Sequence, residues 1–161
     1  MDYRRLGRTN QQTSVISLGT EYLIDLPVEH VHGVIQTALK AGINYFDLFY
    51  ANPGFRDIMG KVFEGHREDV MLAAHLGAGE EDGQYKATRD IAQCRFYFED
   101  FLNRYHTDYA DVRFLHNCDG EEDFHTIMAP GGLKDIALDY KAKGKARFIG
   151  FSSHTTDTAI E

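Results

Sequence analysis

The chain alternates between short apolar runs and longer amphipathic segments. Unbroken apolar runs are typical of strands buried on both faces, and we predict such strands at residues 15–19, 43–46, 70–74, 111–115 and 146–151. Between these runs, apolar residues recur every three or four positions, which is the spacing of a helix face. In residues 3–15 apolar and polar side chains instead alternate, and Gly7-Arg8-Thr9-Asn10 within this stretch is typical of a turn. This pattern predicts a short hairpin before the main fold.

The amphipathic segments predict helices between the strands. The first helix opens at Asp25 and stops at Gly42, and the second is centred on residues 55–63. The clearest helical spacing spans residues 91–105 and places Cys94 on the apolar face. We therefore expect Cys94 to be a packing residue instead of a reactive thiol.

Two polar stretches interrupt this pattern and are predicted to be loops. Residues 77–83 are rich in glycine and acid, and a loop of this length suggests a functional role. Residues 119–123 form a second acidic loop, which is followed by helical sequence that ends near Gly144. Strand and helix thus alternate throughout, which predicts a parallel α/β sheet with right-handed crossovers.

Periodicity alone leaves open whether this sheet is doubly wound or part of a barrel. The glycine fingerprint of a dinucleotide-binding open sheet is missing after the first strand, where residues 18–22 read Leu-Gly-Thr-Glu-Tyr. A (β/α)8 barrel typically needs about 250 residues, and this chain ends just after its fifth predicted strand. We therefore expect the N-terminal part of a TIM barrel as one incomplete domain, with a hairpin at 1–15 and β/α units at 16–161.

Composition narrows the partners that the chain could have. It has 17 Lys and Arg against 25 Asp and Glu, a net charge of −8, which argues against binding nucleic acid. No apolar run is long enough to span a membrane and no signal-peptide core follows Met1, so we expect a cytoplasmic protein without a membrane partner. Cys94 and Cys118 lack the spacing of a disulfide framework or a metal finger and are expected to be reduced.

Polar side chains gather where the predicted strands end. In parallel α/β folds the chemistry lies at the carboxyl ends of the strands, because the loops there meet on one face. Each residue alone has a structural explanation: an aspartate can cap a helix, a histidine can belong to the core, and a tyrosine can line a barrel mouth. Their coincidence after consecutive strands favours a site. The candidates are Asp47, Tyr50, His75 and His116.

Several blocks of the sequence resemble the aldo-keto reductases. Any one block is weak, but they occur in family order through nearly the whole chain. They are residues 3–9 (Tyr-Arg-Arg-Leu-Gly-Arg-Thr), 17–20 (Ser-Leu-Gly-Thr), 41–47 (Ala-Gly-Ile-Asn-Tyr-Phe-Asp), 107–111 (Thr-Asp-Tyr-Ala-Asp), Leu115-His116, and 144–153 (Gly-Lys-Ala-Arg-Phe-Ile-Gly-Phe-Ser-Ser). The resemblance implies a (β/α)8 barrel that reduces carbonyls to alcohols with a nicotinamide cofactor.

The family resemblance also implies site residues. The family uses a Tyr that gives the proton, a Lys and an Asp that lower the pKa of that phenol, and a His that orients the carbonyl. Asp47 and His116 match the Asp and the His, but Asn52 stands where the Tyr is expected and His75 where the Lys is expected. Three readings stay open: Tyr50 gives the proton with His75 as its charged partner, His75 is itself the acid, or hydride transfer has been lost.

The cofactor implied by the resemblance is NADP(H) or NAD(H), with Gly19, Thr20, Ser152 and Ser153 near its nicotinamide end. The family usually has Ser-Asn at the last two positions, and the Ser153 hydroxyl cannot reproduce the paired hydrogen bonds of an amide. Some members of a divergent branch carry an iron-sulfur cluster beyond the barrel. The cysteine spacing for such a cluster is missing from this sequence, so we expect it, if anywhere, only in a region absent from this chain.

Two other classes of function stay open. A metal-dependent hydrolase could use Asp47, His75 and His116 with Cys118, Asp119 or His154 as ligands, although no H-x-H or H-E-x-x-H pair anchors two of them on one element. The other class of function is a non-catalytic binding or assembly domain. Because the family's phosphate loops follow later strands, we expect this chain alone neither to bind NADP(H) tightly nor to turn over a carbonyl substrate. We also expect its exposed sheet edges to favour self-association.

Overall fold

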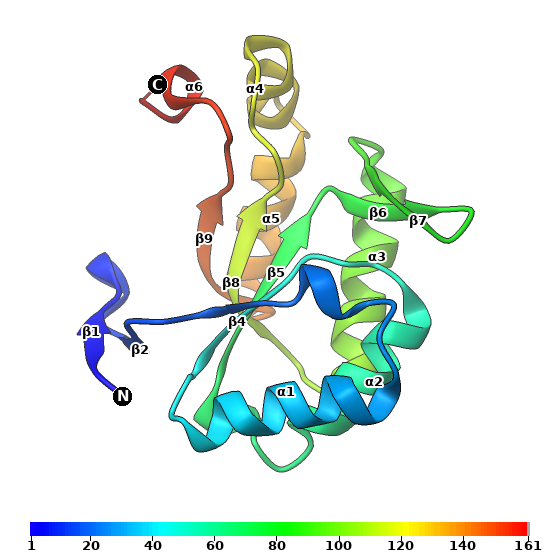
Figure 1. Ribbon diagram of the computed structural model, residues 1–161. Helices are drawn as coiled ribbons and strands as arrows, with labels where there is room; N and C mark the ends of the chain where they lie inside the picture. Colours follow the sequence, from blue (N-terminus) through cyan, green and yellow to red (C-terminus); the bar gives the residue numbers. More distant parts are fainter. Residues whose placement is uncertain (161) are drawn as a thin grey trace.

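The computed structural model describes residues 1–160, and its centre is a parallel sheet of five strands (Figure 1). The strands lie in the order β3-β4-β5-β8-β9. Their bounds are β3 Leu18–Gly19, β4 Tyr45–Leu48, β5 Met71–Leu76, β8 Ala110–Leu115 and β9 Ala146–Phe151. Spatial order follows chain order without a reversal, so the sheet is singly wound, as in a barrel, and it is not closed.

Helices follow the strands of this sheet. They are α1 Val28–Lys40, α2 Pro53–Phe63, α3 Ile91–Arg104, α4 Glu121–Met128, α5 Leu133–Ala142 and α6 Thr156–Ile160. Local sequence explains where two of them begin. The Asn52 side chain accepts a hydrogen bond from the Phe55 amide at the start of α2, and Asp90 accepts one from the Gln93 amide at the start of α3.

The two faces of the sheet are packed differently. Successive side chains of a strand point to opposite faces, so Leu72 and Ala74 of β5 pack with the helices, whereas Met71 and Ala73 point away from them. The large core lies between the sheet and the helices, and the opposite face holds only a small buried cluster that includes Val112. This second face corresponds to the interior of a barrel.

The predicted helices and most of the strands are confirmed, but two predicted segments are shorter than expected. The first strand is shorter than expected, because Val15 and Ile16 are 48% and 58% exposed and only Leu18–Gly19 pairs with β4. The hairpin competes for this segment, since the Val15 amide donates to the Asp2 carbonyl. The predicted loop at 119–123 is also shorter, because α4 already begins at Glu121. Acidic side chains in the first turn stabilise the N-terminus of a helix.

The stretch at residues 77–83 is not the simple loop that composition predicted. It contains β6 Ala78–Glu81, which pairs antiparallel with β7 Gln84–Ala87. Asp82 and Gly83 between them have φ angles of 52° and 78°, the left-handed pair of a tight two-residue turn. This β6–β7 hairpin projects from the carboxyl end of β5 beside α3 (Figure 1).

A second hairpin precedes the sheet. In it, β1 Tyr3–Arg5 pairs antiparallel with β2 Gln12–Ser14, and a 3₁₀ turn at Gly7–Thr9 joins them. Cys94 is buried as predicted, and burial raises the pKa of its thiol to about 11. Cys94 and Cys118 are both free. Among residues 1–160, no helix combines the length and the apolar character needed to cross a membrane.

Candidate active site

Three of the predicted site residues meet at the carboxyl ends of adjacent strands. Asp47 lies on β4, His75 lies on β5, and His116 directly follows β8. One Asp47 carboxylate oxygen is 2.8 Å from His75 Nε2, and His75 Nδ1 is 2.8 Å from His116 Nδ1. The sheet order β4-β5-β8 thus places the three side chains in one continuous chain of contacts.

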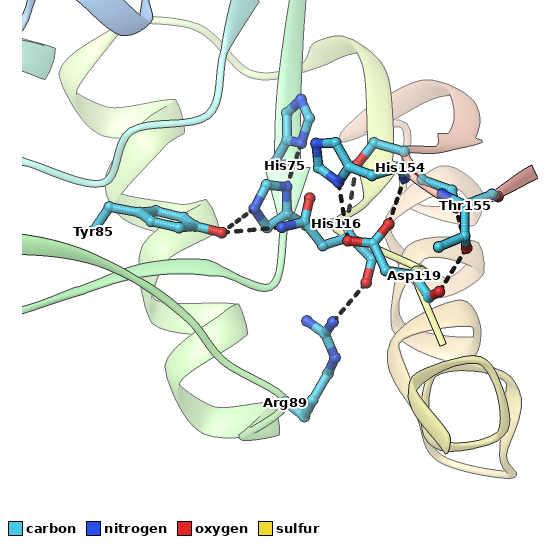
Figure 2. A network of polar contacts seen from close by, with 10 residues as sticks. His75, Tyr85, Arg89, His116, Asp119, His154 and Thr155 are labelled. Atoms are coloured by element: carbon cyan, nitrogen blue, oxygen red, sulfur yellow. Dashed lines mark hydrogen bonds and ion pairs between the residues drawn. The ribbon is translucent and has the colours of Figure 1, made fainter. Parts of the chain in front are cut away.

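A fourth member of this chain was not among the sequence candidates. Tyr85 of β7 places its hydroxyl 2.5 Å from His116 Nε2, and the Asn117 side-chain amide donates to the same hydroxyl at 3.4 Å (Figure 2). The signal that could have found it is the Asp82-Gly83 pair, which is a strong hairpin signal. A hairpin after β5 folds Tyr85 back over the strand ends, which a loop assignment does not predict.

The direction of these hydrogen bonds can be worked out from the carboxylate. An ionised Asp47 only accepts, so His75 donates from Nε2. With a neutral His75, its Nδ1 accepts from His116 Nδ1–H, and His116 Nε2 then accepts from the Tyr85 hydroxyl. Burial, and then His75 and Arg89, lower the pKa of His116 to about 3. His116 is therefore a neutral imidazole at physiological pH.

Aromatic rings form the wall of the site. Phe49 stacks on Tyr50 with ring centres 4.4 Å apart, and it lies almost parallel to the His116 ring at 5.9 Å. The Tyr85 ring stands edge-on to Phe49 at 5.4 Å. Within residues 1–160, the Tyr50 hydroxyl has no hydrogen-bond partner, and burial together with Glu21 raises its pKa.

These side chains line a cavity of about 350 Å³. Its wall contains all four predicted catalytic residues together with Tyr85, and the polar residues Asn117 and Ser152. Ligand pockets usually combine apolar walls with a few placed polar groups, and this one has that composition. Neither Lys nor Arg is among the described residues that line it.

Of the predicted cofactor residues, Ser152 reaches the cavity wall. Its hydroxyl accepts a hydrogen bond from the Asn117 amide, whereas the Ser153 hydroxyl donates to the Thr155 carbonyl. Gly19 pairs with Asp47 in the sheet, and the Thr20 hydroxyl donates to the Asp47 carbonyl at 2.9 Å. Gly19 and Thr20 therefore hold the β4 end in place.

Charged side chains tie the loops around the site together. Arg89 donates to the Asn117 carbonyl at 3.0 Å and pairs with Asp123 at 2.9 Å. Asp119, which follows His116 in the same loop, pairs with His154 beyond β9 at 2.9 Å (Figure 2). These contacts fix the loop after β8 from both sides, and with it the position of His116.

The candidate ligands Asp47, His75 and His116 of the metal-hydrolase alternative contact one another. Both ring nitrogens of His75 already contact Asp47 or His116. Across the part of the chain that the structure describes, no group of three His, Cys, Asp or Glu side chains is placed to hold a metal ion.

Comparison with known proteins decides the family. A sequence model of the Aldo/keto reductase family matches residues 15–160. The chain belongs to this family. Among solved structures, it is similar to the aldo-keto reductase AKR11C1 from Bacillus halodurans (holo form), with 25% identity and a TM-score of 0.83, over 99% of this chain and 53% of that one.

Two curated relatives of this aldo/keto reductase chain are also similar. The uncharacterized oxidoreductase YqkF of Bacillus subtilis (strain 168) is 28% identical over 157 residues, which cover 95% of this chain and 49% of the relative. A protein of Oryza sativa subsp. japonica, described as a probable voltage-gated potassium channel subunit beta, is 30% identical over 129 residues, with coverages of 74% and 38%. The chain therefore spans half or less of the length of these relatives.

Proposed function

We propose that this aldo/keto reductase chain provides the catalytic side chains of an enzyme that reduces a carbonyl compound to an alcohol with NAD(P)H. The observation that carries the proposal is the contact chain Asp47–His75–His116 at the carboxyl end of the sheet, inside a cavity of ligand size. General support comes from the family and from oxidoreductase relatives.

The cavity suits one end of a nicotinamide cofactor. Its aromatic wall can pack against a flat ring, and Asn117 and Ser152 offer polar groups for a carboxamide. The described wall holds neither Lys nor Arg, the side chains that usually make charge-assisted contacts to phosphates. The fit is therefore to the nicotinamide and the substrate, and the choice between NADP(H) and NAD(H) rests on residues outside the cavity.

The cofactor and the side chains of the site have different roles in the proposed reduction. The nicotinamide, when bound, supplies hydride to the carbonyl carbon. His116 is buried and neutral, and its ring nitrogens contact His75 and the Tyr85 hydroxyl, so it can hold that hydroxyl beside a substrate. Asp47 faces His75 at 2.8 Å and stabilises that imidazole when it is charged. The His75 imidazole, held beside this carboxylate, can store the proton that the product oxygen needs.

The test is a turnover assay with NADPH and NADH against a panel of aldehydes and ketones. It should be run on the 161-residue chain and on any longer protein that contains it. We expect cofactor oxidation by the longer form and at least a ~100-fold loss of kcat in His116→Asn, the range of general acid–base contributions. His125→Asn, the same change at an exposed histidine of α4, is the matched control. Cofactor binding without turnover on the whole panel would instead favour a non-catalytic binding domain.

We also propose that the 161-residue chain alone binds NADPH weakly, since its described cavity wall offers neither Lys nor Arg to the phosphates. Calorimetry of this chain with NADPH measures the affinity directly, and its mass in solution tests self-association at the sheet edges. Micromolar binding by a monomer would contradict this proposal without touching the assignment of the site.

A further inference from the structure

Two tyrosines, Tyr50 and Tyr85, line the cavity, and they differ in the hydrogen-bond partners of their hydroxyls. Tyr85 contacts His116, which contacts His75, which contacts Asp47. The Tyr50 hydroxyl has no such partner among the described residues. A proton donor has to recover its proton after each turnover, and only the Tyr85 hydroxyl is hydrogen-bonded to a titratable side chain.

We propose that Tyr85 gives the proton to the substrate oxygen, and that His75 replaces it through His116. The inference deepens the proposed carbonyl reduction and rests on it. It assigns the donor to the β6–β7 hairpin and not to the loop after β4, where Tyr50 stands. The chain in Figure 2 runs from Tyr85 through the His116 ring to His75.

The loaded state of this relay follows from donors and acceptors. A protonated His75 donates from both nitrogens, to Asp47 and to His116 Nδ1. His116 stays neutral but must then carry its proton on Nε2, from which it donates to the Tyr85 oxygen. The Tyr85 hydrogen is thereby released from His116 and can point into the cavity. Protonation at the His75 end thus turns the tyrosine into a donor.

The proton step balances without an added reagent. The Tyr85 O–H bond breaks as the substrate oxygen gains that proton. The proton on His116 Nε2 then moves to the Tyr85 oxygen, and the one on His75 Nδ1 moves to His116 Nδ1. His75 ends as a neutral imidazole that still donates to Asp47. The relay reloads when the Tyr85 oxygen takes a proton from water and passes its own proton to His116 Nε2, while the His116 Nδ1 proton moves to His75 Nδ1. The electron pair of the new C–H bond is the hydride of the proposed function.

The surroundings of the relay fit these charges. Tyr85 is 38% exposed, so protons from water can enter the relay at its hydroxyl, while His116 is buried. Arg89 and Asp119 also face His116 and act on its pKa in opposite directions. The hairpin itself is anchored, because the Tyr97 hydroxyl of α3 donates to the Glu80 carbonyl at 2.6 Å. Tyr97 is therefore a positioning residue for Tyr85.

The first test needs neither cofactor nor turnover. Ring ¹⁵N NMR of the 161-residue chain reports which nitrogen of each histidine carries hydrogen. We expect His116 to move its proton from Nδ1 to Nε2, without becoming charged, when His75 carries a proton on both nitrogens at low pH. Tyr85→Phe removes the partner of His116 Nε2 in both states, so the ¹⁵N shift of that nitrogen should change at every pH. Tyr50→Phe should leave that shift unchanged. A His116 that keeps one tautomer at every pH would overturn the relay.

The second test compares the two tyrosines in turnover. Tyr85→Phe should lower kcat at least ~100-fold, as expected for loss of a general acid, and the loss in Tyr50→Phe should be at least tenfold smaller. The wild-type kcat should also fall at high pH, where the relay holds no proton to pass on. A larger loss in Tyr50→Phe would move the donor to Tyr50 and end the proposal. If the wild type reduces no carbonyl, the proposed function fails, and the tautomer switch alone then decides whether the relay exists.

Discussion

Each end of the parallel sheet holds an aspartate, and the surroundings of the two carboxylates differ. At the amino end, Asp111 of β8 is 1% exposed and accepts hydrogen bonds from Arg67, Arg147 and the Leu72 amide. At the carboxyl end, Asp47 is 42% exposed, and its only side-chain partner that the structure gives is His75. Asp111 is paired with two arginines, which are permanently charged, whereas Asp47 faces a histidine, which can gain or lose a proton.

The difference separates structural from chemical use of the same residue type. An arginine stays charged at all relevant pH values, so the Asp111 cluster holds β5, β8 and β9 together in one state. The Asp47 cluster consists of an imidazole pair and a phenol, whose protons can be redistributed without moving heavy atoms. We infer that the amino end serves stability and the carboxyl end serves reactivity, and the following changes test that division.

The largest expected effect is at the amino end. Asp111→Asn removes the negative charge between two arginines and leaves Arg67 and Arg147 facing each other without compensation. Breaking a buried ion pair from one side costs about 3–5 kcal/mol. Urea denaturation should show this loss of unfolding free energy. Asp108→Asn, at an exposed aspartate three residues earlier, should stay within about 0.5 kcal/mol. Equal effects of the two variants would contradict a structural role for the cluster.

The same substitution at the other end should show the reverse. Asp47→Asn removes the charge that stabilises a protonated His75, so we expect a loss of kcat of about 100-fold. Its unfolding free energy should change by less than about 1 kcal/mol, because the side chain is partly exposed and makes one ion pair. Parallel turnover and denaturation measurements check both values. A large loss of stability with unchanged kcat would remove the contrast between the two ends.

The sequence predicted the sheet better than it predicted the site. Strands such as Ala146–Phe151 and helices such as Ile91–Arg104 follow directly from apolar runs and helical spacing. The hairpin at residues 78–87 does not, because Ala-Gly-Glu-Glu has poor strand propensity. It is stabilised by tertiary contacts, including the Tyr97 ring, which lies where a side chain on Gly79 would be. The sequence analysis did not identify Tyr85 for this reason, whereas Asp47 and His116 lie in blocks that resemble the family.

Protonation of the carboxyl-end cluster should be visible in stability. Burial lowers the pKa of His116 to about 3, below its ordinary value of 6.5, with further lowering by His75 and Arg89 and opposition from Asp47 and Asp119. The unfolded chain then binds more protons than the folded one between these two values, so this contribution is complete above pH 6.5 and is lost as pH falls toward 3. It amounts to about 2 kcal/mol between pH 7 and pH 5. Denaturation of the wild type and of His116→Asn across this range should differ in slope, and identical slopes would mean that His116 titrates normally.

The smallest expected effect concerns the hairpin that brings Tyr85 to the carboxyl end. The Tyr97 hydroxyl donates to the Glu80 carbonyl, and Tyr97→Phe removes this one hydrogen bond while it keeps the ring against Gly79. A single such bond contributes about 1 kcal/mol. Because the hairpin is a projecting element, the loss should appear as local opening, with amide exchange in β6 and β7 about fivefold faster and exchange in β5 unchanged. Tyr22→Phe, the same change at an exposed tyrosine outside the hairpin, is the matched control. Faster exchange throughout the sheet would show that the hairpin is part of the core and not a separate support for Tyr85.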